Sequence, residues 1–128
     1  MTRRKTYKHP KKGSVQHVRL EHWFLDSDAW RSLSPAPRAL YIELKKLYNG
    51  HNNGEFFLSH REGARLLNVH RNSIGGYFQE LIERGFIKQT QMPHLGPSGI
   101  GRSSKWALTE ATINEKPATK EFMRWRKK

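Results

Sequence analysis

The chain has 128 residues, of which 35% are hydrophobic, so it can bury one modest core but cannot hold two full domains. Its 24 lysines and arginines outnumber its 11 acidic residues, and the formal net charge of +13 favours a polyanionic partner such as nucleic acid. The absence of cysteine excludes disulfides, thiolate nucleophiles and cysteine-ligated metal sites.

Other patterns narrow the function classes further. No apolar run is long enough for a spanning helix or a signal peptide, so we expect no membrane partner. The seven histidines include no close ligand pair, and Asp26 and Asp28 are the only aspartates, so no metal site is expected. Because no nucleophile–base pair or carboxylate cluster can be assembled, we expect a protein that is not an enzyme and needs no cofactor.

The first segment, residues 1–19, carries only basic charged side chains, and proline, glycine and serine are interleaved with them. This composition predicts a flexible basic arm. With a DNA-binding domain behind it, the arm would contact phosphates or a minor groove; the alternative is a solubilising tail. The residues of the basic arm are Arg3, Arg4, Lys5, Lys8, Lys11 and Lys12.

Two helices are predicted after residue 20. Asp26-Ser27-Asp28 is predicted to cap a short helix, and Trp30 on that helix is expected to lie in the core. Ser34-Pro35 starts a longer helix, with a capping side chain followed by proline at the first helical position. Leucines then recur at helical spacing until Asn49-Gly50 ends this helix.

A short strand and a pair of helices follow. Residues 55–58 form an apolar run with strand character. Ser59 and Glu62 have the spacing of a capping box, in which Ser59 accepts from the Glu62 amide and the Glu62 side chain reaches back. Asn68 tolerates a left-handed turn and ends that helix. The next helix, which Gly85 ends, carries one apolar stripe of Ile74, Tyr77, Phe78, Leu81 and Ile82.

The rest of the chain predicts two strands and a tail. Residues 86–92 and 105–109 are strand-like, and the glycine- and proline-rich segment 93–104 between them is predicted as a loop. We therefore place one domain at residues 20–109. The basic tail, residues 110–128, carries an apolar cluster that we expect to dock on the domain or on a partner chain. The cluster consists of Phe122, Met123 and Trp125.

The segment from His60 to Arg84 resembles a helix-turn-helix. Ala64 stands where the two helix backbones approach closely, and Asn68 where glycine is commonest in that family. Residues 81–88 and 102–109 resemble the wing-forming segments of winged-helix regulators and replication initiators from bacterial phages, plasmids and integrative elements. The resemblance implies an α+β, mainly α fold, a winged helix-turn-helix with a three-helix core and a small antiparallel β-wing. The family's apolar locking positions are filled by Leu67, Val69, Ile74 and Tyr77.

A recognition helix that is locked by its inner face leaves its first turn and outer face free to enter the major groove. Arginine suits guanine there, and asparagine or glutamine suits adenine. The residues predicted to read bases are Arg71, Asn72, Ser73, Gly76 and Gln79. Those predicted to contact phosphate or to act in the wing are Ser59, His60, Arg61, His70, His94, Arg102, Ser103 and Lys105. For His60 and His70, which flank helix starts, helix capping is the alternative.

Two adjacent glycines, Gly75 and Gly76, interrupt the predicted recognition helix. Each costs a helix about 1 kcal/mol relative to alanine, so a close approach should offset that cost. The approaching group is either DNA or a neighbouring helix. We slightly favour helix packing for Gly75, and for Gly76 the two explanations are even.

These features predict a sequence-specific double-stranded DNA-binding protein, a transcriptional regulator of a bacterial mobile element, located in the cytoplasm with the nucleoid. The alternatives are a replication or recombination accessory factor and a winged-helix interaction module that binds nucleic acid without specificity. No ligand-sensing domain follows the wing, so no small-molecule effector is expected. A homodimer stays open as a partner, since only the apolar clusters at residues 23–25 and 122–125 are available to join two copies.

Overall fold

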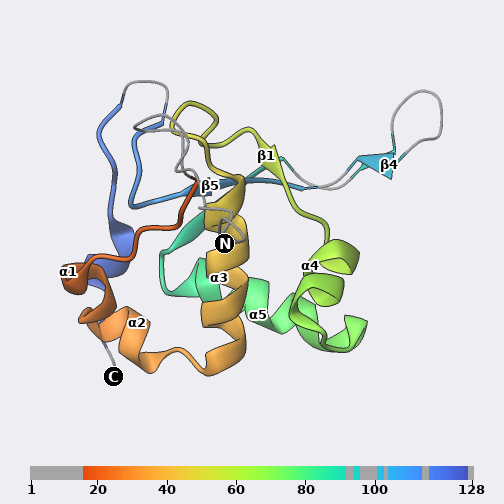
Figure 1. Ribbon diagram of the computed structural model, residues 1–128, viewed down its shortest axis with the longest axis horizontal. Helices are drawn as coiled ribbons and strands as arrows, with labels where there is room; N and C mark the ends of the chain where they lie inside the picture. The colour runs from red at the N-terminus through yellow and green to blue at the C-terminus, as the bar shows by residue number, and fades with distance from the viewer. Residues whose placement is uncertain (1–15, 92–93, 96–100, 103, 114–115, 127–128) are drawn as a thin grey trace, which may run out of the picture.

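The computed structural model describes residues 16–91, 94–95, 101–102, 104–113 and 116–126. Within these ranges the chain is an α+β protein, mostly helical, with five α-helices and a three-stranded antiparallel sheet (Figure 1). None of the described helices is long and apolar enough to cross a membrane. The helices are α1 (His22–Leu25), α2 (Asp28–Ser32), α3 (Pro35–Leu47), α4 (His60–Leu67) and α5 (Arg71–Glu83).

The first helices begin where local chemistry favours a start. Ser27 caps α2, because its hydroxyl accepts a hydrogen bond from the Trp30 amide at 3.2 Å. Ser34 precedes α3, but its side chain makes no capping hydrogen bond, contrary to the prediction. Proline at the first helical position, Pro35, therefore marks the start of α3 without that cap, since its fixed φ angle already suits a helix.

The helices α3, α4 and α5 pack on one another, and the core lies between the helices and the sheet, with buried side chains from α1, α2 and η1 as well. Its centre is aromatic, with ring centroids of neighbouring side chains between 4.9 and 5.8 Å apart. Edge-to-face and offset arrangements of this kind contribute beyond the burial of their area. The five rings belong to Phe24, Trp30, Tyr41, Phe86 and Phe122.

The tail contributes one of those rings. A 3-10 helix, η1 (Glu121–Arg124), places Phe122 fully buried against Phe24 and Phe86. Trp125 packs half-buried against the core, whereas Met123 is 37% exposed. Two of the three residues in the predicted tail cluster therefore dock on the domain itself.

The sheet contains β1 (Phe56–Phe57), β5 (Lys105–Leu108) and β2 (Ile87–Gln91), in that order. A second antiparallel pair, β3 (His94–Leu95) and β4 (Gly101–Arg102), sets His94 opposite Arg102. The prediction of an uninterrupted loop over residues 93–104 is therefore wrong. Strands of two residues are too short to show the alternation by which a strand is recognised in a sequence.

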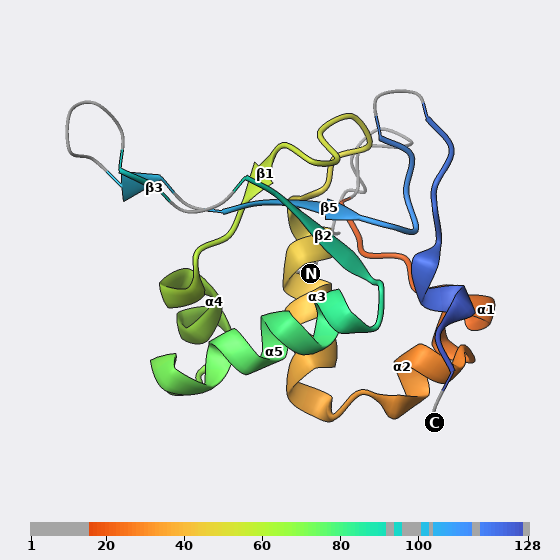
Figure 2. The same ribbon diagram turned by 180° about the vertical axis from the view of Figure 1, so that it is seen from behind.

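The elements divide the molecule into two ends. Figures 1 and 2 show β3 and β4 projecting beyond α4, on the same side as the start of α5. In both views α1, α2 and η1 lie at the opposite end, and η1 packs against α2. The start of α5 and the β3–β4 pair, which carry residues predicted to contact nucleic acid, therefore lie at the end of the molecule opposite the docked tail.

Candidate nucleic-acid interface

The inner face of α5 is held in the core. Ile74, Phe78 and Leu81 are buried, and α5 packs on both α3 and α4. The outer side carries the residues predicted to read bases: Arg71, Asn72, Gly76 and Gln79 are exposed, and Ser73 is half-buried. The Gln79 amide donates a hydrogen bond to the Glu83 carboxylate at 3.3 Å, so a partner that used Gln79 would have to compete with Glu83.

The first turn of α5 is fixed by a histidine. His70 is the N-cap, and its Nδ1 accepts a hydrogen bond from the Asn72 amide at 3.0 Å. Capping was one of the two roles expected for this residue. Within the described part of the chain, the side chains of Arg71 and Asn72 have neither a hydrogen bond nor an ion pair. They extend from a helix N-terminus, where the free backbone amides and the helix dipole favour an anion such as phosphate.

Ser59 caps α4 as predicted, accepting from the Glu62 amide at 3.0 Å. The other half of the predicted capping box is wrong, because the Glu62 carboxylate accepts from Arg65 Nε at 2.9 Å instead. That hydrogen bond lowers the pKa of the Glu62 carboxyl. Arg65 and Glu62 also form an ion pair, so the charge of Arg65 is compensated. By contrast, the exposed Arg61 has no ion-pair partner among the described residues. Arg61 is thus the available cation at the start of α4.

A tight turn joins α4 to α5. Asn68 adopts the left-handed conformation predicted for it, with φ 56°, and the Val69 amide donates to the Ala64 carbonyl oxygen at 3.1 Å. Gly63 of α4 also packs against α5, because it is buried and a Cβ at that position would contact the side chains of Ile74 and Phe78 at 3.4 Å. Our sequence reasoning did not single out Gly63, although a glycine inside a short helix was a visible clue.

The two glycines of α5 have different surroundings. A Cβ on Gly75 would lie 3.6 Å from the His60 ring, which is an ordinary van der Waals contact, so helix packing does not require glycine there. This weakens the explanation that we favoured for Gly75. A Cβ on Gly76 would meet no atom within 4 Å. The protein's own packing therefore gives no reason for glycine at Gly76.

An aromatic stack ties the start of α4 to α5 and to the sheet. The exposed His60 ring stacks on Phe78, with centroids 4.8 Å apart and an interplanar angle of 15°. Phe78 in turn stacks on the buried Trp106 of β5, at 4.7 Å and 14°. His60 is therefore positioned by packing against α5, beside Gly75.

The remaining predicted contacts are divided between the strands and the undescribed residues. Lys105 on β5 forms an ion pair with Glu55 at 2.9 Å, and its Nζ lies 5.3 Å from the Phe57 ring centroid. Phe57 is 47% exposed and was missed from sequence, although two consecutive strand residues cannot both face the core. The predicted contacts of Ser103 and of the arm residues lie outside the described part of the chain; the arm residues are Arg3, Arg4, Lys5, Lys8, Lys11 and Lys12.

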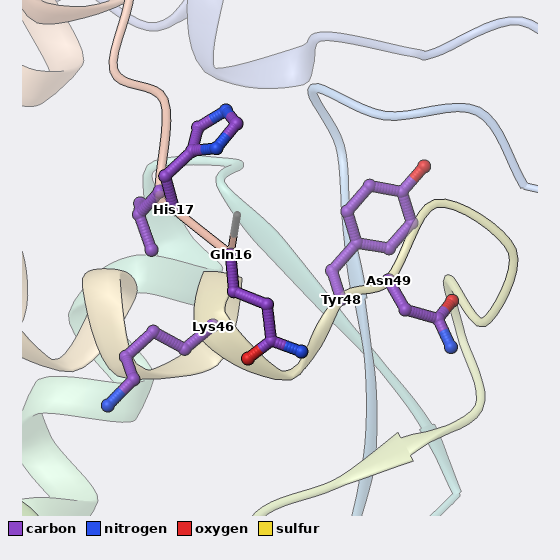
Figure 3. Close-up of a pocket in the computed structure, with 6 residues that line it drawn as sticks. Gln16, His17, Lys46, Tyr48 and Asn49 are labelled. Carbon is purple, nitrogen blue, oxygen red and sulfur yellow. The ribbon is translucent and has the colours of Figure 1, made fainter. Parts of the chain in front are cut away.

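A hollow of about 520 Å³ lies at the C-terminal end of α3, lined by residues 16–18 and by Lys46, Tyr48 and Asn49 (Figure 3). The Lys46 side chain points away from Tyr48 and Asn49. Lys45 donates a hydrogen bond to the Arg19 carbonyl oxygen, so the last residues assigned to the basic arm lie along α3. In the described ranges, no group of three His, Cys, Asp or Glu residues could hold a metal ion.

Comparison with known proteins gives no assignment for this surface. The chain matches no family model, no curated protein and no solved structure.

Proposed function

We propose that the protein binds double-stranded DNA sequence-specifically through a winged helix-turn-helix. In this proposal α4 and α5 are the helix-turn-helix, α5 enters the major groove, and β2, β5 and the β3–β4 pair form the wing. The observation that carries it is the first turn of α5. There Arg71 and Asn72 are exposed and have no side-chain partner among the described residues, on a helix whose inner face is buried.

The chemistry of that turn suits base edges. A guanidinium can form two hydrogen bonds with guanine, and a carboxamide two with adenine. The cation of Arg61 and the N-terminus of α5 suit the flanking phosphates, which fix orientation without reading sequence. The formal net charge of +13 favours association with any duplex, because each neutralised phosphate releases counterions.

Selection of bound sites from a random duplex library tests the proposal. We expect one enriched sequence, bound at least about 10³-fold better than a scrambled duplex. The same contact would serve a transcriptional regulator of a mobile element or a replication accessory factor, and the genomic position of the enriched site separates these roles. Binding without enrichment would instead favour an interaction module that holds nucleic acid loosely.

Substitutions in the first turn of α5 test whether this helix recognises the base sequence. Arg71→Ala and Asn72→Ala are each expected to relax preference at particular base pairs, by about 1–3 kcal/mol of discrimination, and to leave the melting temperature nearly unchanged. Arg61→Ala is the matched control, because loss of a phosphate contact weakens all sites alike. Competition with single-base variants of the enriched site measures this. If both α5 variants keep the parent preference profile, α5 does not read the DNA.

A further inference from the structure

Two apolar clusters that are far apart in the sequence form one surface at the end of the molecule opposite β3 and β4. Trp23 of α1 and Met123 of η1 are each 37% exposed. They line a hollow of about 210 Å³ together with Asp26, Asp28 and Arg126. We call these five residues the α1–η1 surface. Its two large apolar side chains are therefore open to solvent in the single chain.

The aromatic part of this surface is rigid. The Trp23 ring stacks on the buried Phe122, with centroids 6.0 Å apart and an interplanar angle of 22°. The ammonium group of Lys120 lies 4.8 Å from the Trp23 ring centroid. A ring held in this way loses little conformational entropy on binding, which favours a role as an interface anchor.

Two exposed ion pairs lie near the two apolar side chains, in addition to the Lys120 cation beside Trp23. Arg31 pairs with Asp26 at 3.4 Å, and Arg126 pairs with Asp28 at 3.6 Å. All four side chains are more than half exposed, so these pairs contribute little to the stability of the single chain and can exchange partners. The surface also holds both aspartates of a chain whose formal net charge is +13.

We propose that the α1–η1 surface is the interface of a homodimer. A two-fold interface uses the same patch on both copies, so the patch has to be complementary to itself. Asp26 and Asp28, together with the arginines that they pair with, meet that requirement, because each aspartate can pair with an arginine of the second copy. Tryptophan, methionine and arginine are also the residue types enriched in protein interfaces.

A second copy is the occupant that the charges favour. Two chains of net charge +13 repel each other over most of their surface, so association is favoured where opposite charges face each other. The α1–η1 surface provides those charges. It lies away from α4, the start of α5 and the β3–β4 pair (Figures 1 and 2), so a dimer leaves the candidate nucleic-acid interface uncovered. The homodimer does not depend on the function proposed above.

Charge reversal with full-length protein tests the interface. Analytical ultracentrifugation of the parent protein is expected to give a concentration-dependent species of twice the chain mass. Asp28→Arg or Arg126→Asp alone places like charges across the two-fold axis and should weaken the dimer roughly tenfold. An equimolar mixture of the two variants should restore it, since every contact then joins opposite charges.

Met123→Asp should also give a monomer, because it buries a charge at the centre of the interface. Leu47→Asp is the matched control: Leu47 is similarly exposed, at 39%, but lies on α3, and this variant should remain a dimer. Circular dichroism confirms that each variant is folded. A parent protein that is monomeric at every concentration overturns the proposal. So does a dimer that survives Met123→Asp and both charge reversals, which would place the contact elsewhere.

Discussion

Asn53 shows how much of the fold can depend on one polar side chain. It is 5% exposed, and its amide nitrogen donates to the carbonyl oxygens of Leu108, Ala111 and Thr112 at 2.9, 3.2 and 3.0 Å. Its oxygen accepts from the Leu108 amide at 2.7 Å. The loop before β1 is thereby fixed to the end of β5, and four backbone groups depend on a single residue.

We expect Asn53→Ala to lower the free energy of unfolding by about 3 kcal/mol, because it removes the side-chain partner of the buried Leu108 amide and three hydrogen bonds to carbonyl groups. Urea unfolding measures this loss. Asn72→Ala removes the same side chain from an exposed position with no side-chain bond to a described residue, and it should leave stability within about 0.5 kcal/mol of the parent. Equal losses in the two variants would contradict the role assigned to Asn53.

Gly76→Ala is expected to change the stability of the protein and its affinity for DNA in opposite directions. Since open space surrounds its Cα on the outer face of α5, Gly76→Ala should raise the free energy of unfolding by up to about 1 kcal/mol. In the proposed complex the added methyl group would face the DNA, so affinity for the selected site should fall. Thermal unfolding and a binding titration of the same variant measure both effects.

Gly85→Ala is the contrasting control for Gly76→Ala. Gly85 has a φ of +82°, and a Cβ there would lie 2.9 Å from the backbone at Glu121 and Phe122, so this variant should be destabilised. If Gly76→Ala is more stable and binds DNA as tightly as the parent, the outer face of α5 does not closely approach DNA at this position.

Among the elements, those with a local cause were predictable from sequence. Ser27 and Ser59 cap their helices and Asn68 makes its left-handed turn, because each acts on backbone groups within three residues. The outward side of α5 followed from its apolar stripe in the same way. By contrast, α1, η1, β3 and β4 span only two to four residues, too short for any periodicity. Their formation depends on distant partners, as when Phe122 packs on Phe24.

Competition between local partners was also not predictable. The Glu62 carboxylate had two suitable donors, the Ser59 amide and Arg65, and the charged donor took it. Charge-assisted hydrogen bonds are the stronger kind, which explains the outcome after the fact. Strand parity predicts that either Phe56 or Phe57 faces outward but not which one, so the exposure of Phe57 required the register with β5.

Tyr41 and Glu110 link α3 to the segment after β5. The Tyr41 hydroxyl donates to the Glu110 carboxylate, which also pairs with Lys45 at 2.8 Å. Burial, and then the neighbouring carboxylate, raise the pKa of Tyr41 well above its ordinary value. The stabilisation by Tyr41 is therefore complete below the unfolded value of about 10 and is lost as pH rises through the folded pKa.

Tyr41→Phe should accordingly lower the free energy of unfolding by about 1.5 kcal/mol at neutral pH, since a hydrogen bond to a charged group is removed. The difference between the variant and the parent should shrink above about pH 10, because only the parent has to keep this hydroxyl protonated in order to fold. Urea unfolding across this pH range measures the difference. Tyr48→Phe serves as the control, and a difference for Tyr41→Phe that is constant with pH would contradict the assignment.

At the scale of the whole molecule, composition predicted the polyanionic partner class but not the separation of surfaces. The starts of α4 and α5, which carry Arg61 and Arg71, lie at one end, and α1 and α2, where Asp26 and Asp28 stand, lie at the other. Only the folded arrangement of α1 beside η1 brings Trp23 and Met123 together. The two proposals therefore use separate ends of the molecule, one for DNA and the other for a second copy.

The basic arm should add affinity without adding specificity. Deletion of residues 1–15 removes its six predicted contacts and spares Val18, which is half-buried beside α3. Each neutralised phosphate contributes about 0.9 to the slope of log K against log salt, so the truncated protein should show a slope shallower by up to about 5. Affinity should fall for all duplexes alike, and the preferred site should stay the same, because phosphate contacts carry no sequence information.

Fluorescence anisotropy titrations at several salt concentrations, with the enriched and a scrambled duplex, measure both quantities for the arm. A competition titration of the truncated protein, with the scrambled duplex as competitor, gives its preference for the enriched site directly. If the truncated protein prefers a different site, the arm reads bases or groove shape. If the slope of log K against log salt is near zero for the full-length protein, its positive charge does not drive association with DNA. That result would exclude phosphate contacts by the arm, by Arg61 and by the start of α5.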